Sequence, residues 1–266
     1  MSKIIAFVNQ KGGVAKTPTA INLSACLAQC GKRVLLVDAD PQGNATGGLG
    51  QDRREIEHCI YDVLIHGVPA QAVIRPSAWP GLSILPATIQ LAGAEIELVS
   101  AISRETKLKR ALKPQRKNYD YIFIDCPPSL GLLTLNALTA ADSIIIPLQC
   151  EFYALEGVTQ LLNTYTLARR HLNPELSIEG VLLTMYDSRT NLAQQVAEDA
   201  KGFFGDRLFD TIIPRNVRLS EAPSHGLPII YYDAKSKGAE VYCQLAEEFL
   251  ARQAQAEQEQ NQTEQE

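Results

Sequence analysis

The stretch of sequence that most constrains this fold lies near the amino terminus, between an apolar run and a segment with helical periodicity. It reads Lys-Gly-Gly-Val-Ala-Lys-Thr from Lys11 to Thr17, and residues 4–8 before it are apolar. Residues 19–28 carry apolar side chains at helical spacing, so the stretch joins a buried strand to a helix. Glycines there let backbone N–H groups turn toward an anion, and the helix N-terminus adds partial positive charge. The pattern predicts a phosphate-binding loop.

Two side chains of this loop have predictable roles. Lys16 would reach the β- and γ-phosphates of a nucleotide, and the Thr17 hydroxyl would ligate Mg²⁺. The ordinary pattern G-x-x-x-x-G-K-[ST] is not met, because Gln10 and Ala15 stand where it has glycines. An ordinary glycine-containing turn with two surface lysines is therefore the alternative for this stretch taken alone.

Acidic residues end two further apolar runs. Residues 33–37 lead into Asp38-Ala39-Asp40-Pro41-Gln42-Gly43, and residues 119–126 include Asp125 near their end. The carboxyl ends of parallel strands face the crevice where ligands bind, so Asp38 and Asp40 could handle Mg²⁺ or an attacking water. Asp125 could hold Mg²⁺ through a coordinated water. The alternative for Asp-Pro-Gln-Gly is turn chemistry alone.

Apolar runs and amphipathic stretches alternate along most of the chain. This alternation predicts an α/β fold in three layers, with a mostly parallel twisted sheet and helices on both faces. We expect a single domain over residues 1–252 and a disordered, polar, acidic tail over residues 253–266. The remaining strands are expected at residues 82–85, 143–147, 178–185 and, at an edge, 208–213. Helices are expected at residues 56–64, 155–172, 191–204 and 236–251.

Composition limits the class of protein. A hydrophobic content of 45% can fill a substantial core, and six cysteines without a C-x-x-C pair favour a reducing, cytoplasmic setting. No apolar run approaches the ~20 residues that span a bilayer, so we expect a soluble protein. The net charge of −5 neither requires nor excludes nucleic acid. Residues 104–117 hold seven basic side chains and one acidic one, for which a solvated helix face is favoured over an anionic partner.

Several motifs in order carry a family resemblance. They are the loop at residues 11–17, Val-Asp-Ala-Asp-Pro-Gln-Gly-Asn at 37–44, Ile-Asp-Cys-Pro-Pro-Ser-Leu-Gly at 124–131, and Ile-Pro-Arg-Asn-Val-Arg-Leu-Ser-Glu-Ala-Pro-Ser at 213–224. Over about residues 1–250 the chain resembles the ParA/Soj partitioning ATPases, which belong to the ParA/MinD family of P-loop NTPases with a deviant Walker A motif. In that family a signature lysine, here Lys11, precedes the glycines.

The resemblance implies a function for the whole chain. ATP and Mg²⁺ would close two copies into a sandwich dimer, in which Lys11 of each subunit touches the phosphates bound by the other. The ATP-bound homodimer would bind double-stranded DNA nonspecifically on the nucleoid. A ParB/Spo0J-type partner at centromere-like DNA would stimulate hydrolysis.

The resemblance also assigns roles to residues. Asp40 aligns with the carboxylate that positions the attacking water, and with Lys11 and Lys16 it would form the catalytic set. Mg²⁺ would involve Thr17, Asp38 and Asp125. Arg189 and Arg218 match arginines that relatives use to contact DNA. Nucleotide binding falls on Lys11, Gly12, Gly13, Val14, Ala15, Lys16, Thr17 and Pro18, with Pro214 and Asn216 at the adenine.

Two loop positions depart from the family's usual K-G-G-V-G-K-T-T. Ala15 replaces a glycine, and Pro18 replaces a threonine or serine. Pro18 has no backbone N–H and no hydroxyl, so two donors that normally face the α-phosphate are missing. A hydrogen bond to a charged group is worth roughly 1.5–3 kcal/mol, so we expect weaker ATP binding or slower hydrolysis than in relatives. Alanine at a position that needs positive φ would add strain.

Other members of the lineage suggest alternative functions. A MinD-like membrane ATPase ends in a basic amphipathic helix, whereas this tail is polar and acidic, which predicts no membrane partner. Reductases that resemble the nitrogenase iron protein need cysteines for a cluster, and here only Cys126 follows the strand that ends at Asp125. A nucleotide-gated binding protein with impaired turnover is a third alternative, because the loop is altered.

Overall fold

A single seven-stranded sheet organises the computed structural model, which describes residues 2–151 and 154–263. The strand order is β3-β4-β2-β5-β1-β6-β7, and every neighbouring pair is parallel except β3 with β4. This arrangement confirms the predicted α/β fold with a mostly parallel sheet. The strands are β1 Lys3–Phe7, β2 Val34–Asp38, β3 Arg75–Pro76, β4 Leu82–Leu85, β5 Tyr121–Asp125, β6 Ser143–Gln149 and β7 Ser177–Thr184.

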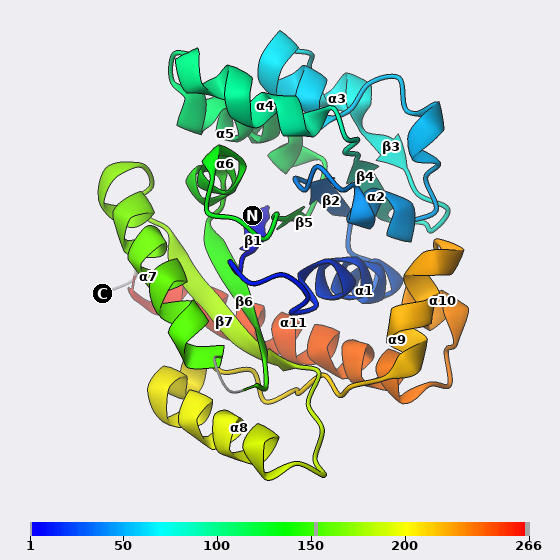
Figure 1. Ribbon diagram of the computed structural model, residues 1–266, viewed down its shortest axis with the longest axis vertical. Coiled ribbons are helices and arrows are strands. Elements are labelled where there is room, and N and C mark those ends of the chain that lie inside the picture. The colour runs from blue at the N-terminus through cyan, green and yellow to red at the C-terminus, as the bar shows by residue number, and fades with distance from the viewer. Residues whose placement is uncertain (1, 152–153, 264–266) are drawn as a thin grey trace.

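Helices cover both faces of the sheet (Figure 1). Ile4 and Ala6 of β1 face a core shared with α4 to α7, while Ile5 and Phe7 face a core shared with α1, α10 and α11. Successive side chains of a strand point to opposite faces of the sheet. Both faces of this sheet are buried, and β1 therefore has apolar side chains on both sides. The helices are α1 Lys16–Gln29, α2 Asn44–Gly48, α3 Ala70–Val73, α4 Leu91–Glu97, α5 Lys107–Leu112, α6 Leu132–Ala140, α7 Ala154–His171, α8 Asn191–Phe204, α9 Val217–Glu221, α10 Ile229–Tyr232 and α11 Lys237–Thr263.

The register of three central strands places the acidic strand ends together. β5 lies between β1 and β2, and Asp125 is paired with Phe7 on one side and with Asp38 on the other. Parallel strands in this register end at one edge of the sheet. The loop after β1 and both carboxylates therefore meet at that edge.

Two elements differ from the sequence-based expectation. The helix expected at residues 56–64 begins only at Ile60, after Cys59, whose N–H donates to the Asp62 carboxylate, and it continues as the π-helical turn Asp62–His66. The edge strand expected at residues 208–213 is not formed. This segment meets β7 through one isolated bridge, between Leu208 and Val181, and through two hydrogen bonds in which the N–H groups of Phe209 and Ile213 donate to carbonyl oxygens of β7. Its position is fixed by Phe209, whose ring is buried against Gly180, where any side chain would collide with it.

The carboxyl terminus is more ordered than the sequence predicts. The tail expected to be disordered over residues 253–266 is helical in α11 as far as Thr263, and residues 264–266 lie outside the described residues. Gln253 is buried, accepts a hydrogen bond from Lys3 and donates one to Glu179. Alanine, glutamine and glutamate are good helix formers, so a helix anchored at Gln253 extends readily through such residues. The single-domain assignment stays a prediction.

Helix α11 should be anchored by its apolar core and not by its polar end. Phe249 is fully buried and makes edge contacts with the rings of Tyr121 and Phe123, at centroid distances of 5.2 and 6.0 Å. We expect Phe249→Ala to lower the free energy of unfolding by about 3–5 kcal/mol in urea denaturation. Truncation after Ala254 should change it by less than ~0.5 kcal/mol. Equal decreases in the two variants would show that the end of α11 belongs to the core.

Candidate functional site

The loop between β1 and α1 contains two residues with a left-handed backbone conformation. Gly13 has φ 78° and Ala15 has φ 61°. Ala15 also caps α1, and it has no side-chain oxygen with which to accept a helix N–H. A left-handed conformation costs a residue with a Cβ about 1–2 kcal/mol, so the expected strain at Ala15 is confirmed.

Lys16 lies inside the loop. Its side chain is buried, and its Nζ donates to the carbonyl oxygen of Lys11 at 2.9 Å. Burial lowers the pKa of this ammonium, and the nearby carboxylate of Asp125 opposes that change. The loop therefore holds a desolvated cation beside two carboxylates, Asp125 and Asp40.

Thr17 joins the loop to the end of β5. Its hydroxyl donates to Oδ2 of Asp125 at 2.6 Å. Oδ1 of Asp125 is enclosed and has no hydrogen-bond partner among the described residues. Burial first, and then the charge of Asp38, raise the pKa of Asp125 well above its usual range. An unpaired buried carboxylate oxygen is costly, so this side chain is matched to a cation.

Asp38 shapes the neighbouring turn. Its Oδ2 accepts hydrogen bonds from the N–H and the hydroxyl of Thr46, at 2.8 and 2.7 Å, and its Oδ1 accepts from the Asp40 N–H at 3.2 Å. Burial raises the pKa of Asp38 to about 6. Asp38 was predicted to be a metal ligand, but both of its carboxylate oxygens accept hydrogen bonds that position Asp40 and Thr46. Sequence reasoning missed Thr46, since a threonine shortly after a turn gives no distinct signal.

Asp40 faces the cavity beside the loop. The side chain is largely buried, and its Oδ1 accepts from the N–H of Gln42 at 2.9 Å. The cavity has a volume of about 560 Å³. Asp40 and six of the predicted loop residues line it, whereas Asp38, Asp125, Lys11 and Val14 do not. The lining includes Gly12, Gly13, Ala15, Lys16, Thr17, Pro18 and Asp40, together with Arg53, Pro128 and Met185.

A second cavity of about 260 Å³ adjoins the first and is lined by Pro214 and Asn216, the residues predicted for the adenine. Ala15, Pro18 and Met185 line both cavities, so the two lie side by side. Met185, just after β7, has φ 51°, and sequence reasoning missed it because it reads as the last apolar residue of a strand.

Two predicted loop residues point away from the cavity. The Lys11 ammonium pairs with the carboxylate of Glu151 in the same chain, and both side chains are partly exposed. Val14 is buried, and its carbonyl oxygen accepts from the Thr184 hydroxyl at 3.2 Å. Val14 therefore anchors the loop to β7, while Lys11 remains at the surface.

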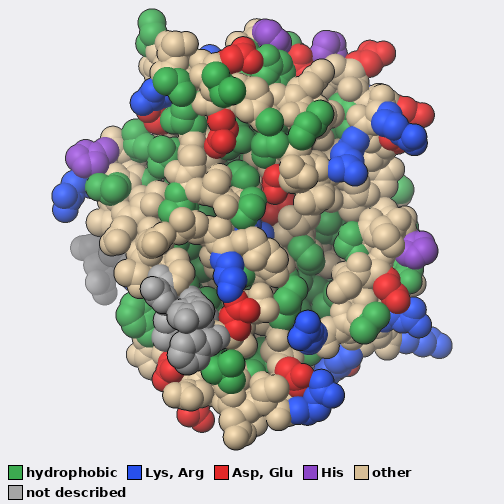
Figure 2. Space-filling model, in the orientation of Figure 1, with side chains coloured by type: hydrophobic (Ala, Val, Ile, Leu, Met, Phe, Trp, Pro, Cys, Tyr) green, Lys and Arg blue, Asp and Glu red, His purple; other side chains and the backbone are tan. Residues whose placement is uncertain are grey.

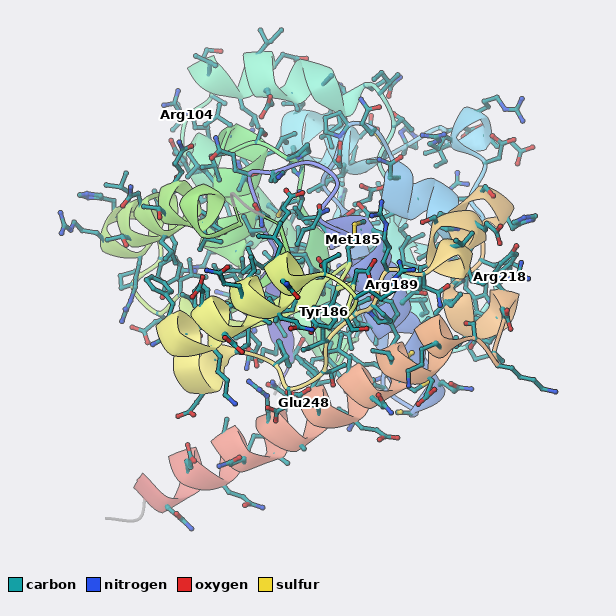
Figure 3. All side chains as sticks on the ribbon, turned by 60° about the horizontal axis from the view of Figure 1, so that its bottom comes forward. Arg104, Met185, Tyr186, Arg189, Arg218 and Glu248 are labelled. Atoms are coloured by element: carbon teal, nitrogen blue, oxygen red, sulfur yellow. The ribbon has the colours of Figure 1, made fainter. Side chains whose placement is uncertain are left out.

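The two predicted DNA-contacting arginines lie on separate surface elements, near Met185 and on α9 (Figure 3). Arg189 pairs with Asp187 at 2.6 Å, and Arg218 pairs with Glu221 at 2.9 Å. Both guanidinium groups are largely exposed. Exposed pairs of this kind are worth about 0–1 kcal/mol, so either arginine can exchange its partner for a phosphate at small cost.

The chain matches known proteins over nearly its whole length. The family model described as AAA domain matches residues 2–178. The sporulation initiation inhibitor protein Soj of Bacillus subtilis is 64% identical, over 94% of this chain and 99% of that protein. The chromosome partitioning protein ParA of Myxococcus xanthus is 56% identical, over 95% of this chain and 89% of that protein.

A solved structure shares the fold at similar coverage. Cobyrinic acid a,c-diamide synthase from Mycobacterium smegmatis, with a bound ATP analogue and magnesium, is 41% identical with a TM-score of 0.82. The match covers 93% of each chain. Together with the loop, the acidic strand ends and the cavity beside them, these similarities establish that the chain belongs to the ParA/Soj family of chromosome-partitioning ATPases.

Proposed function

We propose that this protein is an ATP-driven partitioning switch. ATP closes two copies into a sandwich dimer, the dimer binds double-stranded DNA without sequence preference, and a ParB/Spo0J-type partner stimulates hydrolysis. The observation that supports this most is the convergence of Lys16, Thr17, Asp40 and Asp125 at one sheet edge, beside a cavity that adjoins a second one lined by Pro214 and Asn216.

The chemistry of the two adjacent cavities fits ATP. The phosphates lie against Gly12 and Gly13 with Lys16 as counter-charge, and the base occupies the smaller cavity beside Pro214 and Asn216. Pro18 lines both cavities, at the loop position whose N–H and hydroxyl would face the α-phosphate in relatives, and it offers no N–H. The loop therefore binds the triphosphate with fewer donors than its relatives have.

Mg²⁺ fits the oxygen atoms at the end of β5. Hard cations prefer oxygen ligands, and the unpaired Oδ1 of Asp125 and the hydroxyl oxygen of Thr17 lie together there. Asp38 contributes indirectly, because its hydrogen bonds fix the turn that carries Asp40. An ion held there with the nucleotide would supply positive charge against the phosphates.

Asp40 orients the water that attacks the γ-phosphate, because its carboxylate faces the cavity and is fixed by the Gln42 N–H. Lys16 neutralises charge from within the subunit, and Lys11 of the neighbouring copy adds a second cation in the dimer. Hydrolysis is therefore slow in the single chain and faster in the closed dimer.

No helix within residues 2–151 and 154–263 has the length and apolar content to cross a bilayer.

Restoring the usual loop residues should tighten nucleotide binding. We expect Ala15→Gly/Pro18→Thr to bind a fluorescent ATP analogue at least tenfold more tightly in the presence of Mg²⁺, because it regains donors to the α-phosphate. Ala15→Gly alone is the control: it removes the strain at φ 61° and raises stability, but adds no donor. Equal affinity of the double variant and the natural sequence would contradict the weakened-loop hypothesis.

The buried carboxylate at Asp125 should make stability depend on pH. Its pKa is raised in the folded protein, so the folded state holds the proton more tightly and loses stability as pH rises above the unfolded value of about 4. We expect nucleotide-free Asp125→Asn to melt at a higher temperature than the natural protein at pH 8, with a smaller difference at pH 5.

The same variant tests the metal assignment. Added ATP with Mg²⁺ should raise the melting temperature of the natural protein and raise that of Asp125→Asn much less. An Asp125→Asn protein that gains as much from Mg²⁺ as the natural sequence would remove Asp125 from the site.

DNA binding should depend on Arg189 and Arg218. We expect Arg189→Ala/Arg218→Ala to bind DNA at least tenfold more weakly with ATP present, and the slope of log affinity against log salt to fall by about 0.9 for each phosphate that is no longer neutralised. Arg169→Ala/Arg170→Ala removes the same charge from an exposed surface in the last turn of α7 and serves as the matched control. Similar weakening in both variants would indicate nonspecific charge effects and not these arginines.

A further inference from the structure

Two cysteines far apart in the sequence are in contact where α1 packs against α11. The Sγ atoms of Cys26 and Cys243 lie 3.9 Å apart. Cys26 is buried and Cys243 is partly buried, and both are free thiols. No other two thiols are in contact within residues 2–151 and 154–263. A single buried thiol acts as a small apolar side chain, but two sulfur atoms in contact also form a site with its own chemistry.

The interface between α1 and α11 holds these thiols in place. Figure 1 shows α11 running beside α1, and a hydrogen bond of 3.2 Å between the hydroxyl groups of Thr19 and Tyr242 joins the two helices. Thr19 and Cys26 are seven residues apart, so they lie on the same side of α1. Tyr242 directly precedes Cys243 on α11 and is fully buried. These contacts keep the two sulfur atoms close, which raises their effective concentration for a reaction with each other.

A disulfide between these thiols requires only a small movement. The S–S bond is about 2.05 Å long, so the two sulfur atoms must approach by about 2 Å from their separation of 3.9 Å. Rotation of the two side chains and a slight shift of the helices supply such a change. Because the two cysteines lie on separate helices, the bond would fasten α1 to α11.

We propose that Cys26 and Cys243 form a modification site, at which a small-molecule disulfide such as oxidised glutathione oxidises the two thiols to a disulfide. Formation of this bond does not depend on the proposed function. In compartments that keep thiols reduced, protein disulfides are usually transient and serve redox sensing or catalysis. The pair is therefore suited to respond to an oxidised thiol pool and to return to the reduced state afterwards.

The reaction consists of two thiol–disulfide exchanges. Cys243 is the more accessible thiol, so its thiolate attacks one sulfur of oxidised glutathione and expels the first glutathione, which takes up the proton. The thiolate of Cys26 then attacks the sulfur of Cys243 and expels the second glutathione, which takes up the second proton. Two protein thiols are thereby oxidised, and one glutathione disulfide is reduced to two glutathione molecules. Burial raises the pKa of Cys26, so this thiol reacts in the second step, where the sulfur that it attacks is already in contact.

Oxidation at this site would affect the nucleotide cavities through both helices. Lys16 and Thr17 form the start of α1, and Figure 2 shows the surface hollowed over that end of the helix. Tyr242 lines the smaller cavity and adjoins Cys243. Drawing Cys243 toward α1 displaces Tyr242 and disturbs its hydrogen bond to Thr19. We therefore expect the oxidised chain to bind ATP more weakly, an effect that rests on the proposed function.

Peptide mass spectrometry after incubation with oxidised glutathione tests the bond. We expect the natural protein to yield a linked pair of peptides that contain Cys26 and Cys243, and dithiothreitol should separate them. Cys30→Ser is the matched control and should still form the link, because Cys30 is an exposed thiol at the end of α1 and lies outside the pair. Glutathione attached to Cys30 or Cys243 without a link to Cys26 would overturn the inference.

Nucleotide binding gives the second measurement. With Mg²⁺, the oxidised natural protein should bind a fluorescent ATP analogue more weakly than the reduced protein by a factor of about three or more. Cys243→Ser treated in the same way should form no link and keep its affinity. Equal affinities of the oxidised and reduced natural protein would overturn the regulatory role of the site, even with the disulfide formed.

The outcomes separate this inference from the proposed function. A natural protein that binds no ATP in either state, yet forms the disulfide, removes the proposed function and supports the modification site. A natural protein that binds ATP but forms no disulfide removes only this inference.

Discussion

The hydrogen bond from Thr17 to Asp125 is the contact on which the site depends. It ties the first turn of α1 to the end of β5, and the parallel register of β5 with β1 and β2 sets the ends of the three strands side by side. Asp38 then fixes the turn that carries Asp40 through bonds to Thr46 and to the Asp40 N–H. One sheet edge therefore determines the positions of the loop, the buried carboxylate of Asp125 and the cavity wall.

This edge is organised at the expense of stability. Asp125 is buried with an unpaired oxygen, Asp38 is fully buried, and Ala15 is held at a positive φ. Each feature costs free energy in the nucleotide-free chain. The surrounding core tolerates these costs because both faces of the sheet are packed with apolar side chains. A bound cation and phosphate would remove the electrostatic part of this free-energy cost. Ligand binding would therefore stabilise this edge of the sheet.

Sequence reasoning predicted the parts of the site that depend on local pattern. The loop, the two acidic strand ends and the alternation of strands and helices are visible in consecutive residues, and the structure brings them together as expected. It missed Thr46 and Met185, because their roles arise from contacts between distant segments. The strand expected at residues 208–213 failed for the same reason, since burial of Phe209 against Gly180 decides the path of that segment. The helical end of α11 depends on anchoring by Gln253, which composition does not reveal.

Lys11 shows how the resting chain can be compatible with a dimer that uses the same side chain. Its ammonium pairs with Glu151, and the two side chains are 44% and 32% exposed. An ion pair exposed to this degree is worth about 0–1 kcal/mol, so it is broken easily. A triphosphate carries more negative charge than one carboxylate and would attract Lys11 more strongly. Under the proposed function, that phosphate comes within reach only when a second copy closes over the cavity. The ion pair with Glu151 therefore gives Lys11 a partner in the single chain, and this pair is weak enough for Lys11 to leave it for a phosphate.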